Sequence, residues 1–209
     1  MNDFEFDPFE SYAKIVVIGV GGAGSNAVNK MLEDKSESIS YWVFNTDAQA
    51  LSTSPCEHRL VLGKNTTRGL GAGGNPSVGK EAALDSIDDI KEIVSGANMV
   101  FIAAGMGGGT GTGAAPVIAR IAKEMDILTV GIVTIPFIFE GEKKIIQALD
   151  GVERIAQHVD ALLVINNERL REIYADLTFM NAFGKADDTL SIAAKSIAEI
   201  ITCLLYTSD

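Results

Sequence analysis

Cysteine and histidine, the side chains that most often build metal sites and disulfides, are scarce in this sequence of 209 residues. Its two cysteines are Cys56 and Cys203, and its two histidines are His58 and His158. Their separation fits no zinc-binding pattern, and two cysteines make no disulfide framework. The sequence also lacks a secretory signal and any run of about 18 apolar residues. We therefore expect a cytoplasmic protein that holds no metal ion directly and does not insert into a membrane.

Positive charge is also in short supply. Lys and Arg number 17 against 28 Asp and Glu, which gives a formal net charge of −11. Such a chain repels nucleic acid and anionic membranes, so we expect no nucleic-acid partner. With 47% hydrophobic residues, the chain can build a packed core. Its length allows one domain, or one domain and part of a second.

Glycine, in contrast, is abundant and gathers after apolar runs. The densest stretch, residues 105–116, lies between a strand predicted at 99–104 and a helix predicted at 117–125. Successive glycine amides can point into one concavity, and a following helix adds unpaired N–H groups and a positive dipole end. Thr110 and Thr112 add hydroxyls that can reach phosphate oxygens or a magnesium-bound water. A packing turn needs only one or two glycines, so we expect a phosphate site here. Its predicted members are Gly105, Gly107, Gly108, Gly109, Thr110, Gly111, Thr112 and Gly113.

A second glycine pattern follows the first predicted strand, residues 14–18. The glycines of residues 19–24 fit G-x-G-x-x-G before a helix predicted at 25–33, and Asp47 follows the next strand, 41–44. Taken alone, this is a dinucleotide fingerprint and favours an NAD-dependent dehydrogenase. Asp47 can serve either near the magnesium or ribose or as a helix N-cap.

The remaining chain continues to alternate between strands and helices. A third glycine-rich segment, residues 67–76, lies between a short predicted strand and a helix predicted at 78–94. The later predicted elements are a strand at 128–134, a helix at 142–159, a strand at 161–165 and a helix at 181–202. This order predicts a Rossmann-like, doubly wound α/β fold with a mainly parallel sheet. The candidate loops then converge at the carboxyl edge of the sheet, where such folds bind ligands.

The string Gly-Gly-Gly-Thr-Gly-Thr-Gly at residues 107–113 resembles the signature loop of the tubulin/FtsZ GTPase superfamily. Residues 26–29, 45–51 and 71–76 continue the resemblance, which covers about residues 14–202. It implies a domain that binds GTP or GDP, with Mg²⁺ held through the phosphates. The first loop and the acid after the second strand would contribute Gly21, Gly22, Ala23, Gly24, Ser25, Asn26 and Asp47. The loop that closes over the γ-phosphate would contribute Gly71, Ala72, Gly73, Gly74 and Asn75.

The resemblance also assigns the ribose and the base. Pro136 and Glu140 would lie at the ribose, where Lys144 replaces the usual arginine and loses its bidentate fork. Asn167 and Phe183 would complete the pocket. At the pair Asp187–Asp188 we assign the main base contact to Asp188 and a lesser one to Asp187. A carboxylate can accept from both N1–H and N2–H₂ of guanine, which favours GTP over ATP.

The resemblance implies a protein that polymerises head-to-tail with copies of itself at the division septum. In the family, an acidic loop of the next subunit orients the attacking water, so we expect no catalytic residue in this chain and little hydrolysis by it alone. We expect a mobile arm at 1–12, a GTP-binding domain at 13–180, a central helix at 181–202 and a non-native tail at 203–209. The resemblance leads us to expect that this sequence lacks the second domain and the C-terminal tail that would contact division-machinery proteins. The alternatives are an NAD-dependent dehydrogenase and a non-hydrolysing structural relative.

Overall fold

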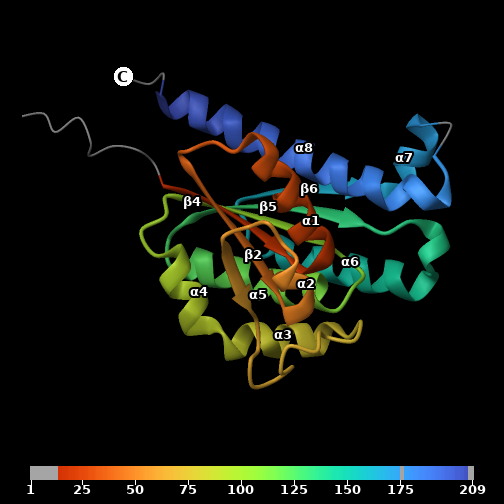
Figure 1. The fold of residues 1–209 in the computed structure, drawn as a ribbon, viewed down its shortest axis with the longest axis horizontal. Helices are drawn as coiled ribbons and strands as arrows, with labels where there is room; N and C mark the ends of the chain where they lie inside the picture. The colour runs from red at the N-terminus through yellow and green to blue at the C-terminus, as the bar shows by residue number, and fades with distance from the viewer. Residues whose placement is uncertain (1–13, 175–176, 207–209) are drawn as a thin grey trace, which may run out of the picture.

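A six-stranded, all-parallel sheet forms the centre of the computed structural model, which describes residues 14–174 and 177–206 (Figure 1). The strand order is β3-β2-β1-β4-β5-β6. The strands are β1 (Ile15–Val20), β2 (Ile39–Asn45), β3 (His58–Val61), β4 (Met99–Gly105), β5 (Leu128–Ile135) and β6 (Ala161–Asn166). The predicted Rossmann-like fold class is confirmed.

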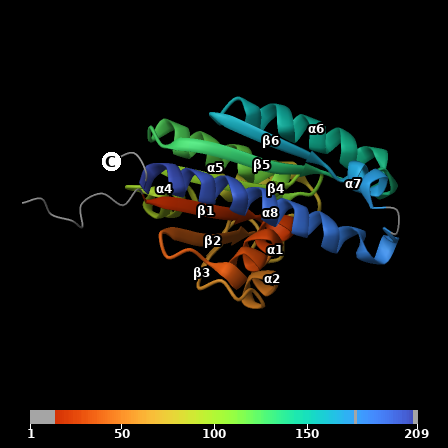
Figure 2. The same ribbon diagram turned by 90° about the horizontal axis from the view of Figure 1, so that it is seen from above.

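Helices cover both faces of this sheet (Figures 1 and 2). The helices are α1 (Gly21–Met31), α2 (Ala48–Ser52), α3 (Pro76–Asp85), α4 (Ile87–Val94), α5 (Thr110–Glu124), α6 (Glu142–Ala156), α7 (Asn167–Ile173) and α8 (Phe179–Tyr206). Short 3₁₀ turns lie at Leu32–Asp34 and Ile138–Glu140. In the described part of the chain, no helix has the length and apolar character needed to cross a membrane.

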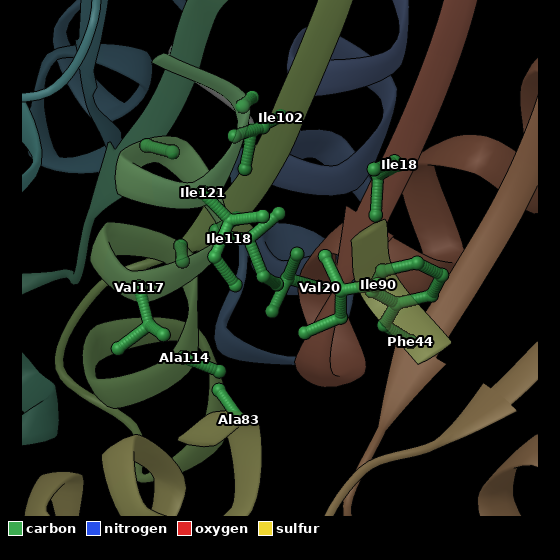
Figure 3. Close-up of a cluster of buried hydrophobic side chains, with 14 of the residues drawn as sticks. Ile18, Val20, Phe44, Ala83, Ile90, Ile102, Ala114, Val117, Ile118 and Ile121 are labelled. Atoms are coloured by element: carbon green, nitrogen blue, oxygen red, sulfur yellow. The ribbon is translucent and has the colours of Figure 1, made fainter. Parts of the chain in front are cut away.

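The core is divided by the alternation of side chains along the central strands. Val16, Ile18 and Val20 of β1 face the layer of α3, α4 and α5, whereas Ile15 and Val17 face α1 and α8. Figure 3 shows the first of these clusters, in which side chains of the sheet meet those of α5 and α4. Because β1 and β4 are buried on both faces, each reads in the sequence as a continuous apolar run.

Two helices begin earlier than the sequence predicts. α1 begins at Gly21 rather than about residue 25, and α5 begins at Thr110 rather than about 117. The glycines therefore form the first helical turns, where they allow close packing. A Cβ on Gly24 would lie 2.2 Å from the carbonyl oxygen of Ala103, and one on Gly111 would lie 2.3 Å from that of Gly105.

The single helix predicted at 78–94 is wrong, because the chain breaks at Ser86 into α3 and α4. Ser86 leaves the helical region with φ −112° and ψ 19°, and its hydroxyl accepts a hydrogen bond from the amide of Gly63 at 2.9 Å. This contact ties the junction to the loop after β3. At the other end of the chain, α8 continues through 203–206, the first residues of the predicted tail. The predicted arm at 1–12 lies outside the described residues.

Candidate functional site

A cleft of about 260 Å³ lies at the carboxyl ends of β4 and β5, between the starts of α1 and α5 and the first turns of α8. Its lining residues come from five segments of the chain. They are Gly22, Ala23, Gly105, Met106, Gly108, Gly109, Thr110, Gly111, Thr134, Pro136, Glu140, Lys144, Asn167, Phe183, Ala186 and Asp187. Thirteen of these sixteen residues were predicted as site members; Met106, Thr134 and Ala186 were missed.

The missed residues lie next to predicted ones in sequence. Met106 lies within the glycine string, Thr134 is the second-to-last residue of β5 just before Pro136, and Ala186 precedes Asp187. Thr134 could have been found, because the last residues of a parallel strand face the ligand edge. Nothing in the sequence marks Met106 or Ala186.

Two helix N-termini meet at one end of the cleft. Neither Val20, which precedes α1, nor Gly109, which precedes α5, makes a side-chain capping bond. A Cβ on Gly21 would lie 3.0 Å from the amide nitrogen of Gly111, so the two helices begin side by side. Gly22 and Gly108 have no described atom within 4 Å of a Cβ position, so their open sides face the cleft. Uncapped N–H groups and two aligned dipoles make this end a site for anions.

The two threonines of the glycine string have different surroundings. The hydroxyl of Thr110 lines the cleft and lies 2.7 Å from the hydroxyl of Thr46. Thr112 is fully buried, and its hydroxyl accepts a hydrogen bond from the amide of Gly107 at 2.8 Å. The expectation that both hydroxyls are free to reach a ligand is therefore wrong for Thr112, which instead fixes the turn at Gly107.

Asp187 of α8 also lines the cleft. Its carboxylate accepts a hydrogen bond from the side-chain amide of Asn26 at 2.9 Å. Burial raises the pKa of Asp187, an effect opposed by the Asn26 hydrogen bond and the charge of Lys30. We expected Asp188 to be the main site residue, but Asp188 pairs with Lys30 of α1 and does not line the cleft. Adjacent helical residues point in different directions, so only one of the two can face the same space.

Aromatic and amide groups also belong to the cleft. The ring of Phe183 makes edge contacts with Phe137 and Phe139 at centroid distances of 5.9 and 5.8 Å. Asn167 is buried, and its side-chain oxygen has no hydrogen-bond partner among the described residues. A buried acceptor without a donor costs free energy, so this oxygen is placed to receive a hydrogen bond from a ligand.

Glu140 and Lys144 also line the cleft. The carboxylate of Glu140 accepts from the amide of Phe137 at 3.0 Å and from the ammonium of Lys144 at 3.2 Å. Lys144 is the only cation among the described residues that line the cleft. Of the three residues predicted near the ribose, Pro136, Glu140 and Lys144, all line the cleft, and Glu140 and Lys144 are bonded to each other.

Several predicted site residues lie outside the lining and have structural contacts. A Cβ on Gly113 would lie 2.0 Å from the carbonyl oxygen of Pro76, so this glycine packs α5 against α3. Asp47 caps α2, because its carboxylate accepts from the amides of Gln49 and Ala50. Of the two roles expected for Asp47, the structure shows the N-cap. The hydroxyl oxygen of the buried Ser25 has no partner among the described residues.

Residues 71–75 of the third glycine-rich segment lie beside the cleft rather than in its lining. A Cβ on Gly109 would lie 2.8 Å from the Cβ of Ala72 and 2.9 Å from the amide of Asn75. Asn75 also caps α3 through the amide of Ser77. The loop therefore packs against the turn that carries the uncapped start of α5. No group of three or more metal-ligating side chains occurs among the described residues.

Comparison with known proteins identifies relatives of this chain. Residues 14–175 match the Tubulin/FtsZ family, GTPase domain. The chain is 60% identical over 189 residues to a protein named cell division protein FtsZ from Porphyromonas gingivalis, covering 90% of this chain and 41% of the relative. It is 52% identical over 196 residues to the protein of the same name from Aquifex aeolicus, covering 93% and 53%. A solved structure described as an empty FtsZ dimer of M. jannaschii superposes with a TM-score of 0.90 at 45% identity, covering 93% of this chain and 57% of that one. The chain thus spans about half the length of these relatives.

Proposed function

This chain belongs to the Tubulin/FtsZ family, GTPase domain, and from that premise we propose that it binds GTP or GDP as the nucleotide-binding part of a polymerising GTPase of bacterial cell division. The observation that carries the proposal is the composition of the cleft. Its lining combines two uncapped helix N-termini with a carboxylate, an unpaired amide oxygen and an aromatic ring. A nucleotide needs this combination, with anionic phosphates at one end and a flat hydrogen-bonding base at the other.

The phosphate end needs close approach by backbone amides. Side chains on Gly22 and Gly108 would fill the space that faces the cleft, so glycine keeps this surface open. The paired hydroxyls of Thr110 and Thr46 lie at the start of α5 and can hydrogen-bond a phosphate oxygen or a metal-bound water. Magnesium held through the phosphates would neutralise part of their charge, which fits the lack of a carboxylate cluster among the described residues.

The base end favours guanine. The carboxylate of Asp187 and the side-chain oxygen of Asn167 are both acceptors, and guanine offers donors at N1 and N2. Adenine has an acceptor at N1 and no 2-amino group, so the same side chains would leave buried polar groups unpaired. Asn26 orients the Asp187 carboxylate, and the ring of Phe183 offers an apolar surface beside it. The main base contact, which we first assigned to Asp188, is thus proposed for Asp187.

Hydrolysis needs a group that orients the attacking water. The described charged residues in the lining are Glu140, Lys144 and Asp187, and each already has a side-chain partner. The water-orienting group therefore comes from the next subunit in a head-to-tail filament, and the isolated chain turns over slowly. The M. jannaschii relative was solved as a dimer, which supports self-association as the mode of action. A head-to-tail interface that does not close generates filaments, here at the division septum in the cytoplasm.

The test is the nucleotide specificity of the purified chain. The nucleotide retained after purification is released by denaturation and identified by chromatography. Calorimetric titrations with GTP, GDP, ATP and NAD, each with magnesium, then give affinities. We expect guanine nucleotide alone to bind tightly. Retention of NAD would support the dehydrogenase alternative. Failure to bind GTP would favour the other alternative, a non-hydrolysing structural relative.

A matched pair of variants tests the base contact. Asp187→Asn loses hydrogen bonds to a charged acceptor, each worth about 1.5–3 kcal/mol, so we expect GTP to bind about 10- to 100-fold more weakly. Asp188→Asn removes the same charge one residue away but only weakens a half-exposed ion pair, worth at most about 1 kcal/mol. If Asp188→Asn has the larger effect, the assignment to Asp187 is wrong.

A further inference from the structure

A second concave surface lies between α3, α5 and α6, away from the cleft. Its volume is about 430 Å³, and Lys80, Arg120 and Arg154 contribute one cation from each helix. Leu84, Pro116 and Val117 provide its apolar part. We call this surface the basic groove.

The cations of the basic groove are only partly neutralised. Arg120 lies 3.9 Å from Glu124, and Arg154 pairs with Asp150. Neither acid lines the groove, and the described lining residues include no carboxylate. In a chain with a net charge of −11, three converging cations are an exception, and they attract an acidic group.

The sequence contains such a group in residues 1–13, before the described part of the structure. These residues include four acids and no lysine or arginine. They also include four aromatic residues, and acids alternate with phenylalanines from Asp3 to Asp7. In an extended segment, this alternation places acids on one side and aromatic rings on the other. A groove lined by both apolar residues and cations is complementary to both sides.

The segment joins the described structure at Lys14, which lies on the same side of the molecule as the groove. Lys14 contacts Asn98 at the start of β4, and the amide of Leu128, which begins β5, donates to the carbonyl of Asn98. The amide of Asp160 donates to the carbonyl oxygen of Thr129 in β5. His158, two residues before Asp160, lines the groove. Figure 2 shows β1 and β5 beginning on the side of the molecule where α6 ends. Neighbouring strands lie about 4.8 Å apart, whereas 13 extended residues span up to about 43 Å. The segment can therefore reach the groove.

From this complementarity and this proximity, we propose that the acidic N-terminal segment, residues 1–13, docks in the basic groove of its own chain. Its carboxylates pair with Lys80, Arg120 and Arg154, and its aromatic rings cover the apolar part formed by Leu84, Pro116 and Val117. The proposal is independent of nucleotide binding, because none of these residues lines the cleft.

Zero-length carbodiimide cross-linking of the full chain tests this docking, because it joins a lysine amine to a carboxylate in contact with it. Mass spectrometry should find Lys80 joined to Asp3, Glu5, Asp7 or Glu10. In an equal mixture of unlabelled and ¹⁵N-labelled chain, the linked peptides should carry one isotope only. Links of mixed isotope would place the segment on a second copy, and the absence of a Lys80 link would place it elsewhere; either result overturns the proposal.

Charge reversal shows whether the groove attracts the segment. We expect Arg120→Glu combined with Arg154→Glu to reduce the yield of the cross-link between Lys80 and the segment several-fold. Lys143→Glu is the matched control, because it reverses an exposed charge at the opposite end of α6 and should leave the link unchanged. High salt should reduce the yield of the same cross-link in the wild-type chain without altering its fold. A link that survives both charge reversal and salt would refute electrostatic docking.

Discussion

Replacing Gly113 by alanine tests the closeness of α3 and α5 most directly. Gly113 lies inside α5, where alanine is favoured over glycine by about 1 kcal/mol. The new Cβ, however, would lie 2.0 Å from the carbonyl oxygen of Pro76 and 2.6 Å from the amide of Lys80. Both are backbone atoms, so a rotamer change cannot relieve the overlap and α3 itself must move. Overpacking of this kind costs about 1–3 kcal/mol, and the backbone contact places Gly113 at the upper end.

The net expectation is a loss of about 2 kcal/mol in the free energy of unfolding, after the gain in helix propensity is subtracted. With an m-value of about 2 kcal/mol per molar in urea, the unfolding midpoint falls by about 1 M. Gly184→Ala is the matched control, because Gly184 lies inside α8 with no described atom within 4 Å of its Cβ position. The free energy of unfolding of Gly184→Ala should rise by up to about 1 kcal/mol.

Urea unfolding followed by circular dichroism and by Trp42 fluorescence measures both variants. We expect the urea midpoint to fall for Gly113→Ala and to rise for Gly184→Ala, although both variants add the same methyl group. If Gly113→Ala is as stable as the wild-type chain, the close approach of α3 to α5 is wrong, and with it the structural role given to this glycine. A change in m-value would instead indicate a loss of two-state unfolding.

Three further predictions concern single side chains. Thr112→Val keeps the side-chain volume but leaves the amide of Gly107 without its acceptor, so the free energy of unfolding should fall by about 1–3 kcal/mol. Thr112→Ser keeps the hydroxyl and should retain most of the wild-type stability. Asn26→Ala releases the Asp187 carboxylate and should weaken GTP binding by about 1 kcal/mol in calorimetry, with little change in stability; an unchanged affinity would show that Asn26 does not position Asp187. Burial, Arg120 and Lys123 lower the pKa of His158 below its unfolded value, so the unfolded state binds the proton more tightly. Stability should therefore fall as the pH drops from about 7 to about 5, and His158→Gln should remove that component in urea titrations at several pH values.

The strands could be predicted from the sequence because the sheet is parallel and covered on both faces. Buried runs such as Met99–Gly105 indicate strands in the sequence, whereas the pairing register is seen only in the structure. The helix starts could not be predicted, because glycine has a low helix propensity and residues 110–116 carry two glycines and Pro116. Tertiary packing against β4 and α3 overrides that preference. The break at Ser86 depends on a hydrogen bond from Gly63, which lies 23 residues away, so no local pattern reveals it.

The site was predicted at the level of segments better than at the level of side chains. Each predicted loop lies in or beside the cleft, because the loops after parallel strands converge at one edge. The choice between Asp187 and Asp188 depends on how α8 is rotated against α1. That rotation is set by Asn26 and Lys30, which bond to one carboxylate each. A sequence pattern that fixes only the helix cannot decide which of two neighbouring acids faces the ligand.

The two glycine motifs at residues 19–24 and 105–116 illustrate why such motifs suggest a larger site than the structure shows. Gly22 and Gly108 are open where a Cβ would stand, and both line the cleft. Gly24 and Gly113 are blocked by backbone atoms of neighbouring elements and do not line it. The same residue type thus keeps space for a ligand at some positions and allows close packing at others. Alanine at the open positions should reduce ligand affinity with little loss of stability, and alanine at the blocked positions should do the reverse, so one substitution series separates the two roles.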